Sequence, residues 1–287
     1  LTCLSNFAIT LVELGRPVEG EPLHQEVLAI RTRIKGAADP DTLDSVMNLA
    51  HCIAAQGRLA EAEKLHRQAI ETRRRVQGAE HDRTLLHMLE LINVIQDQKR
   101  LDEAERLLRD VIATRQRVSG AQDPATLNAS ENLALLLFQQ QQFEECEATL
   151  RQVLMTRQKM QGIAHPDQLP TLENLTIFLV KRKRYAEAES TCRQRLALQQ
   201  KVLGAQHAQT LTQMAGLAEV CGMHGDALRS SGEFAEAAQA YRRGLAVAIE
   251  LEKLAPDDRR GGRLRQMLKS SLDKDSGEKR KQKPGSS

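Results

Sequence analysis

The sequence predicts an all-α fold in which helix–turn–helix repeats stack into an α-solenoid. The first observation behind this prediction is a series of glycines 42 positions apart, namely Gly36, Gly78, Gly120, Gly162 and Gly204. The second is that each 42-residue period holds two segments, each with the apolar spacing of one helical face. The third is that no alternating run of Val, Ile and Thr is long enough to predict a strand.

The first segment of each period is expected to form a helix, which we call helix A. Its apolar residues recur at steps of three and four, as in Leu43, Val46, Leu49, Ala50 and Ile53. Pairs that offer a cap and a first-turn proline precede it at residues 39–40, 123–124 and 165–166. A glycine such as Gly57 is suited to the left-handed position that ends a helix.

The second segment is expected to form a helix B. In one period it begins with the acids Glu61 and Glu63 and ends with three arginines at positions 73–75. Negative charge at the start and positive charge at the end both suit the helix dipole. Gly78 then stops the helix.

Small residues stand where two helices of a pair would cross. Ala50, Ala62 and Ala69 are separated by 12 and then 7 positions, and the same positions in other periods are mostly small or β-branched. Bulkier side chains there would push the helix axes apart, at a cost of roughly 1–3 kcal/mol.

This pattern resembles the tetratricopeptide repeat, in its 42-residue form found in kinesin light chains and nephrocystin-type scaffold proteins. The segments that carry the resemblance are NLA at 48–50 and 132–134, GRLAEAE at 57–63 and DPDTL at 39–43. It covers nearly all of residues 1–253. The resemblance implies a right-handed α-solenoid whose helices A line a concave groove, and a cargo-adaptor-like role as a protein-interaction scaffold. The N-terminal coiled coil of kinesin light chains has no counterpart in this sequence.

The sequence divides into four parts. Residues 1–36 form a first repeat that lacks the start of its helix A, so we expect the chain to be a piece of a longer protein. Residues 37–204 form four 42-residue repeats, of which the last has Pro170 early in helix A and Arg195 in place of a small residue. Residues 205–255 form a repeat with seven additional residues, and an alternative register makes Gly225 its crossing residue. Residues 256–287 are the tail.

The tail is expected to be disordered. Residues 259–287 hold ten Lys or Arg against three acids, with too few apolar side chains to bury a core. A short helix at 263–272 is the alternative. The tail carries more than the whole net charge of +3, so it is the candidate for weak contact with nucleic acid or an anionic membrane, while a solubilising role is the simpler interpretation.

The sequence predicts no enzyme, no metal and no cofactor. Phosphate-binding glycine loops, nucleophile elbows and HExxH motifs are absent. His81, His165 and His207 share a cap position, and His24 and His66 share a packing position on helix B, so repetition would keep them apart rather than around one ion. The paired acids of helix B, such as Glu61 and Glu63, suit its N-terminus. Five cysteines without CxxC spacing fit a reduced, cytoplasmic setting, and the resemblance adds cytoskeletal or ciliary association.

The predicted binding site is the exposed row of helix A. An asparagine recurs at one position of this row, and a primary amide both donates and accepts hydrogen bonds. The resemblance gives these asparagines the role of holding the backbone of an extended peptide, whereas a bond to a neighbouring helix end is the alternative. The predicted contacts are Asn6, Asp44, Asn48, His51, Glu90, Asn93, Asn128, Asn132, Asn174 and Lys181.

The charge of this row indicates the ligand. Lys181 is its one cation, against Asp44, Glu90 and Asp97 in the row and Glu131 and Glu173 near it. We therefore expect a neutral or basic extended segment as partner and no small-molecule substrate.

An arginine row on helix B, made of Arg31, Arg73, Arg115 and Arg157, is expected to be a solvated outer face, with a second docking surface as the alternative. A different overall role stays open, in which the array regulates a larger NTPase or kinase.

Overall fold

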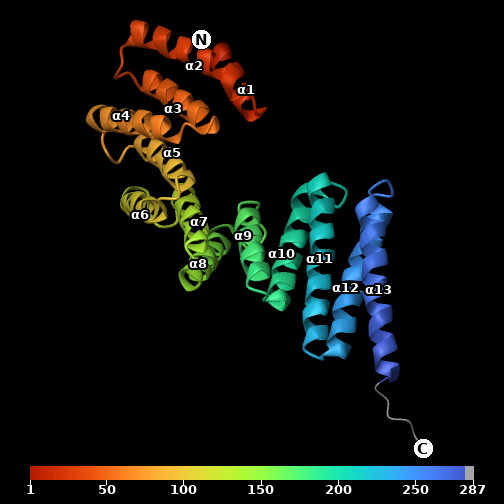
Figure 1. The fold of residues 1–287 in the computed structure, drawn as a ribbon. Helices are drawn as coiled ribbons and strands as arrows, with labels where there is room; N and C mark the ends of the chain where they lie inside the picture. Colours follow the sequence, from red (N-terminus) through yellow and green to blue (C-terminus); the bar gives the residue numbers. More distant parts are fainter. Residues whose placement is uncertain (282–287) are drawn as a thin grey trace, which may run out of the picture. The chain divides into compact units, whose positions relative to one another are not determined.

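The computed structural model describes the backbone of residues 1–281 and the side chains of residues 1–274. Throughout this part of the chain the regular elements are α-helices, as the sequence predicts (Figure 1). In chain order they are α1 (Thr2–Glu13), α2 (Pro17–Lys35), α3 (Pro40–Ala55), α4 (Leu59–Gln77), α5 (Asp82–Asp97), α6 (Leu101–Val118), α7 (Pro124–Gln139), α8 (Phe143–Gln161), α9 (Gln168–Lys181), α10 (Tyr185–Leu203), α11 (Ala208–Ser230), α12 (Phe234–Leu254) and α13 (Arg259–Lys281).

The helices form a repeat solenoid that divides into two compact units. The N-terminal unit, residues 1–142, holds α1 to α7, and the C-terminal unit, from residue 143 onward, holds α8 to α13. Within each unit every helix packs against the next one along the chain. The core consists mainly of Leu, Ile, Val and Ala side chains. The small residues Ala50, Ala62 and Ala69, at which the helices are expected to cross, are all buried.

Helices A lie closer to one another than helices B do in the N-terminal unit. α1 packs against α3, and α3 packs against α5, whereas no comparable packing joins α2, α4 and α6 among the described residues. In a curved stack of helix pairs the more closely spaced layer lines the inner side. Helices α1, α3 and α5 therefore form the inner layer of their part of this unit.

The predicted caps begin α3, α5, α7 and α11, whereas α9 begins after Asp167 and not at the predicted pair 165–166. The Asp39 carboxylate accepts a hydrogen bond from the backbone N–H of Asp41 at 3.0 Å, which satisfies one free donor of the helix N-terminus. The Nδ1 atoms of His81 and His207 accept equivalent bonds at 3.2 and 3.3 Å. These histidines are caps, as their shared repeat position predicts.

The A-to-B turn requires a left-handed residue. Gly57 takes φ 80° there, and Lys99, Gln141 and Lys183 occupy the same position in later repeats with φ between 59° and 63°. A side chain in this conformation is strained. The tight turn is thus kept even where glycine is missing.

Pro170 delays the start of its helix. α9 begins at Gln168, two residues later in its period than α7, which begins at Pro124. The helix therefore starts late, and α9 is two residues shorter than α7.

The seven extra residues of the last repeat lengthen its helix A, since α11 has 23 residues and α3 has 16. Counted back from the turn, Gly225 stands five residues before the end of α11, as Ala50 does in α3. A Cβ atom on Gly225 would lie 2.5 Å from the Tyr241 ring. The alternative register is thus the one that the packing supports, with Gly225 at the crossing.

The expectation of a disordered tail is wrong for the described part of residues 256–287. α13 packs against α12 and α11, and Leu264 and Leu268 are buried there. Gly261 makes the approach to α12 close, because a Cβ atom on it would lie 3.0 Å from the backbone of Glu252. Two leucines on one face are enough to dock a helix onto an existing core, even where its composition could not form a core alone.

Candidate functional site

The inner face of the N-terminal unit is the exposed row of its helices A. On α3 the residues at 44, 48, 51 and 55 are exposed or half-buried, whereas Leu43, Leu49 and Ile53 are buried. The corresponding rows of α5 and α7 are likewise accessible, and so is that of α9 in the C-terminal unit. The predicted contacts therefore lie on accessible surface.

The recurring asparagines have free side chains. Asn6 on α1 and Asn132 on α7 are exposed, and Asn48 on α3 is half-buried, all in the N-terminal unit. Asn174 on α9, in the C-terminal unit, is also half-buried. None of these four amides bonds to another described side chain or backbone group, so the alternative of a bond to a neighbouring helix end has no support.

The other predicted contacts differ in how available they are. His51, Asn93, Asn128 and Lys181 are exposed and Glu90 is half-buried. Asn128 already has an interaction within the protein. The row thus offers amides and a few isolated charges, namely Glu90, Asp97 and Lys181, rather than a dense charged patch.

Asp44 is an exception among the predicted contacts because the protein itself occupies its carboxylate. The Arg73 guanidinium donates to Oδ1 at 2.7 Å, Arg83 bonds to Oδ2, and the Nε2 atom of His87 lies 3.5 Å from Oδ1. Burial would raise the pKa of Asp44, but these three groups outweigh burial and lower it. Asp44 therefore does not present a free negative charge to a ligand.

Two buried histidines lie near this ion-pair cluster. His66 on α4 and His87 on α5 are each 1 % exposed. Burial lowers the pKa of His66 to about 4, helped by the charges of His87 and His51. His66 is therefore neutral near pH 7. Among the described residues no three His, Cys, Asp or Glu side chains gather closely enough to hold a metal ion.

The arginine row of helix B is not a solvated outer face, and that expectation is wrong. Arg73, Arg115 and Arg157 are buried. Arg73 donates to the backbone oxygen of Pro40 at 3.0 Å, and Arg31 and Arg157 likewise bond to backbone oxygens at the first turns of helices A. A long guanidinium stem can bury its methylenes while its head reaches such carbonyls. These arginines of helices B therefore form hydrogen bonds that connect helices B to the starts of helices A.

The paired acids of helix B have a second function besides suiting the helix dipole. Arg58, at the turn, bonds both to Glu61 at the start of its own helix and to Glu21 of the preceding repeat. Arg100 joins Glu63 and Glu103 in the same way, and in the C-terminal unit Arg184 joins Glu147 and Glu187. These carboxylates therefore take part in ion pairs that connect neighbouring repeats.

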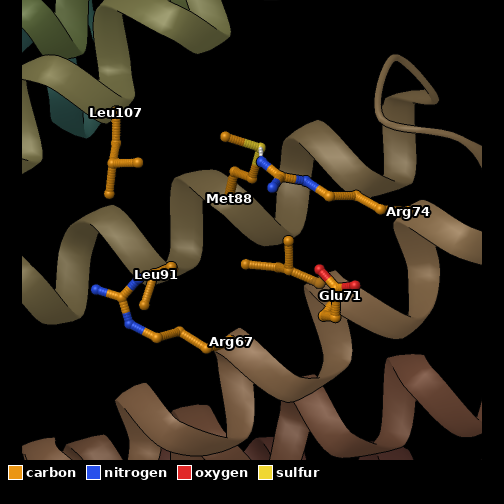
Figure 2. Close-up of a pocket in the computed structure, with 7 residues that line it drawn as sticks. Arg67, Glu71, Arg74, Met88, Leu91 and Leu107 are labelled. Carbon is orange, nitrogen blue, oxygen red and sulfur yellow. Dashed lines mark hydrogen bonds between the residues drawn. The ribbon is translucent and has the colours of Figure 1, made fainter.

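A separate hollow of about 300 Å³ lies between the helices B of the N-terminal unit (Figure 2). Ile70 and Arg74 of α4, Met88 and Leu91 of α5 and Leu107 of α6 line it. The Arg74 guanidinium lies over the Met88 sulfur at 3.4 Å. The hollow opens because α4 and α6 do not pack directly, and it is mainly apolar.

Basic side chains gather on α13 as the composition of the tail predicts. Arg259, Arg263, Arg265 and Lys269 are exposed on this helix, while Lys279 and the basic residues after it lie outside the described side chains. Contact with nucleic acid or an anionic membrane remains a prediction. In the part of the chain that the structure describes, no helix has the length and apolarity to span a membrane.

Family models match most of the chain. One described as "Tetratricopeptide repeat" matches residues 84–159. A second with the same description matches residues 1–41, 42–82 and 171–209, and a third matches residues 218–248. No curated protein sequence matches the chain.

Solved structures of helical repeat proteins are similar to this chain. One is the structure of a putative kinesin light chain with nearly identical repeats from Podosopora anserina, with 25 % identity over 71 % of this chain and 96 % of that one, and a TM-score of 0.60. BtubC (BKLC) from P. vanneervenii has 17 % identity over 88 % of this chain and 92 % of its own, with a TM-score of 0.59. The apo form of RapI has 10 % identity over 95 % and 98 %, with a TM-score of 0.58, and these last two support the fold alone.

Proposed function

This chain belongs to the tetratricopeptide repeat family and is a protein-interaction repeat scaffold, and we propose that it binds an extended peptide along the inner face of its helices A. The observation that carries this proposal is the set of free amides at one repeat position of the N-terminal unit, Asn6, Asn48 and Asn132, with Asn174 at the same repeat position in the C-terminal unit. An amide can donate to a backbone carbonyl and accept from a backbone N–H of the same peptide. Recognition of this kind needs no particular side chains on the ligand.

The rigidity of the scaffold supports the proposal. Within each unit buried arginines join helices B to helices A, and ion pairs such as Arg58–Glu21 and Arg184–Glu147 join neighbouring repeats. A receptor whose rows are already held in place pays little conformational entropy when a peptide docks. Most of the conformational entropy lost on binding would then be that of the peptide.

The charge of the inner face favours a neutral ligand. Asp44 is neutralised by Arg73 and Arg83, and Glu173 forms an ion pair with Arg195. The charges of the row that no ion pair neutralises are then the acids Glu90 and Asp97 and the cation Lys181. The excess of negative charge is therefore smaller than the sequence suggests. The preference for a basic segment therefore loses most of its support, and an uncharged extended segment fits best.

A triple substitution tests this proposal. Asn48→Ala, Asn132→Ala and Asn174→Ala together should weaken binding of peptides selected from a random extended-peptide library by about a hundredfold, since three hydrogen bonds are lost. Fluorescence anisotropy measures the affinity, and circular dichroism checks that the helical content is unchanged.

The matched control changes three exposed glutamines of helices B, namely Gln68→Ala, Gln116→Ala and Gln194→Ala. It should leave the affinity as in the unmodified chain. If the asparagine variant keeps full affinity with intact helices, or if the control loses as much, the inner face is not the binding site.

A further inference from the structure

A cavity of about 430 Å³ lies in the C-terminal unit, between α9, α10 and α11. Its walls are the first two turns of α9 and of α11, and its floor is the second half of α10. The residues that matter in it are Pro170, Glu173, Arg195, Gln199, Thr212 and Gln213. Pro170 belongs to the exposed row of α9, four residues before Asn174, so the cavity adjoins the proposed peptide path.

The cavity coincides with three departures from the repeat. Pro170 is the third residue of α9, a helix that begins two residues late in its period, and it lines the cavity. Arg195 replaces the small or β-branched residue that stands at this position in the other 42-residue repeats, as Ala69 does. Gln199 replaces the arginine of the helix B row. These three deviations would be independent defects in a purely structural repeat, yet all of them line one cavity.

The charges of the cavity cancel. The Arg195 guanidinium pairs with Glu173 at 2.7 Å, on the wall formed by α9. The remaining polar groups at the cavity are neutral amides and a hydroxyl, and Thr212 at the rim also accepts a bond from Arg260 at 3.1 Å. A carboxylate placed in the cavity would meet Glu173, and an ammonium or guanidinium group would meet Arg195. The cavity thus suits an uncharged polar group.

Two residues that line the cavity, Arg195 and Gln199, each have a buried polar atom without a hydrogen-bond partner among the described residues. Gln199 is 4 % exposed and its side-chain oxygen is unbonded, and the Nε–H of Arg195 is unbonded as well. Leaving a buried polar group unpaired costs about 1–3 kcal/mol. One atom requires a donor and the other requires an acceptor, and both come from α10.

We propose that this cavity binds an asparagine or glutamine side chain of the extended peptide on the inner face. A primary amide carries a donor and an acceptor on separate atoms without charge, which is the combination that the Gln199 oxygen and the Arg195 Nε–H require. The proposal rests on the proposed function, because it places one side chain of the same peptide. It adds a sequence preference to recognition that is otherwise directed at the backbone.

Two probes test the cavity. The first is an extended-peptide library in which each position in turn is fixed as Asn, Gln, Asp, Glu, Lys, Arg, Leu or Phe. The second is acetyl-glutamine methylamide, titrated against the full chain by NMR and compared with its glutamate and lysine counterparts. The peptides bound by the unmodified chain should be enriched in Asn or Gln at one position, and the glutamine probe alone should shift the amide signals of Gln199 and Gln213.

The informative variant is Gln199→Leu, which removes the buried acceptor and keeps a similar volume. It should abolish the enrichment and weaken Gln-containing peptides by roughly three- to tenfold. Gln200→Leu, on the next residue of α10 and outside the cavity lining, should change neither result.

The outcomes separate this inference from the proposed function. If peptides bind through the asparagines but no position favours Asn or Gln, the cavity proposal is overturned and the proposed function stands. If no peptide binds yet the glutamine probe shifts the cavity signals in a Gln199-dependent manner, the cavity stands without the peptide path. If neither probe responds, or charged probes respond equally, the cavity proposal is overturned.

Discussion

Arg243 on α12 donates two hydrogen bonds to the carboxylate of Glu189 on α10, at 2.6 and 2.9 Å, although 54 residues separate them. Arg193 and His224 bond to the same carboxylate, whose side chain is only 7 % exposed. Burial would raise the pKa of Glu189, but the hydrogen bonds outweigh burial and lower it to about 2. One acid therefore ties three helices of the C-terminal unit together.

Removing this carboxylate should destabilise the C-terminal unit. Glu189→Gln removes the buried negative charge to which Arg193, His224 and Arg243 bond, so the free energy of unfolding should fall by about 1.5–3 kcal/mol in urea titrations. Glu187→Gln, two residues earlier on α10 with a side chain that is 46 % exposed, should cost less than about 1 kcal/mol. Equal losses for both variants would show that the Glu189 carboxylate stabilises the C-terminal unit no more than an exposed one does.

The stability of the N-terminal unit should fall between pH 6.5 and pH 4. His66 binds a proton below its usual pKa of 6.5 when the chain is unfolded, but only below about 4 when it is buried, so acid favours the unfolded state in this window. The free energy of unfolding should drop by roughly 2–3 kcal/mol there.

Changing His66→Leu tests the origin of this pH dependence. Leu108 and Leu150 occupy the same repeat position, so the variant should fold and lose most of the slope. The exposed His51, changed to Leu, serves as the control and should keep the slope. A His66→Leu chain with an unaltered pH profile would assign the effect to other groups.

Replacing Lys99 by glycine should stabilise the protein. Lys99 has φ 63° at a turn where Gly57 stands one repeat earlier, and relief of a left-handed side chain is worth about 1 kcal/mol. The thermal midpoint should therefore rise. Lys64→Gly, in the middle of α4, is the opposite case and should cost about 1 kcal/mol. A lower midpoint for Lys99→Gly would contradict the strain argument.

Two glycines of α11 should respond in opposite ways to alanine. A Cβ atom on Gly225 would lie 2.5 Å from the Tyr241 ring, whereas one on Gly216 would meet nothing within 4 Å. Gly225→Ala should lower the free energy of unfolding by about 1–3 kcal/mol through overpacking. Gly216→Ala should raise it by roughly 0.5–1 kcal/mol because alanine favours the helix. Equal effects would mean that the crossing lies elsewhere along α11.

Much of the fold followed from local regularities in the sequence. The 42-residue period of the glycines, the alternation of two helical faces and the caps Asp39, His81 and His207 depend on residues close together in the chain. The exposed row of helix A, including Asn48 and Asn132, follows from the same helical spacing. Because these features recur in each period, the assignment of helices in one period supports the assignment in the others.

Contacts between helices could not be predicted from the sequence in this way. Arg73 belongs to a row that looks solvated in the sequence, yet it is buried against Asp44 and the start of α3. α13 looks too polar to fold, yet Leu264 and Leu268 dock it on α12. In both cases the decisive partner lies on another helix, at a distance in the chain that periodicity does not encode.

The sequence by itself determined the helix pairs, their order and the positions of the recurring asparagines, because hydrophobic spacing and capping act over a few residues. Only the tertiary structure decided which charges are free. It neutralised Asp44 and Glu173, placed Arg195 and Gln199 in one cavity and chose Gly225 as the crossing residue. The physical reason is that desolvation and ion pairing depend on what packs against a side chain from neighbouring helices, and this is fixed only once the helices have stacked.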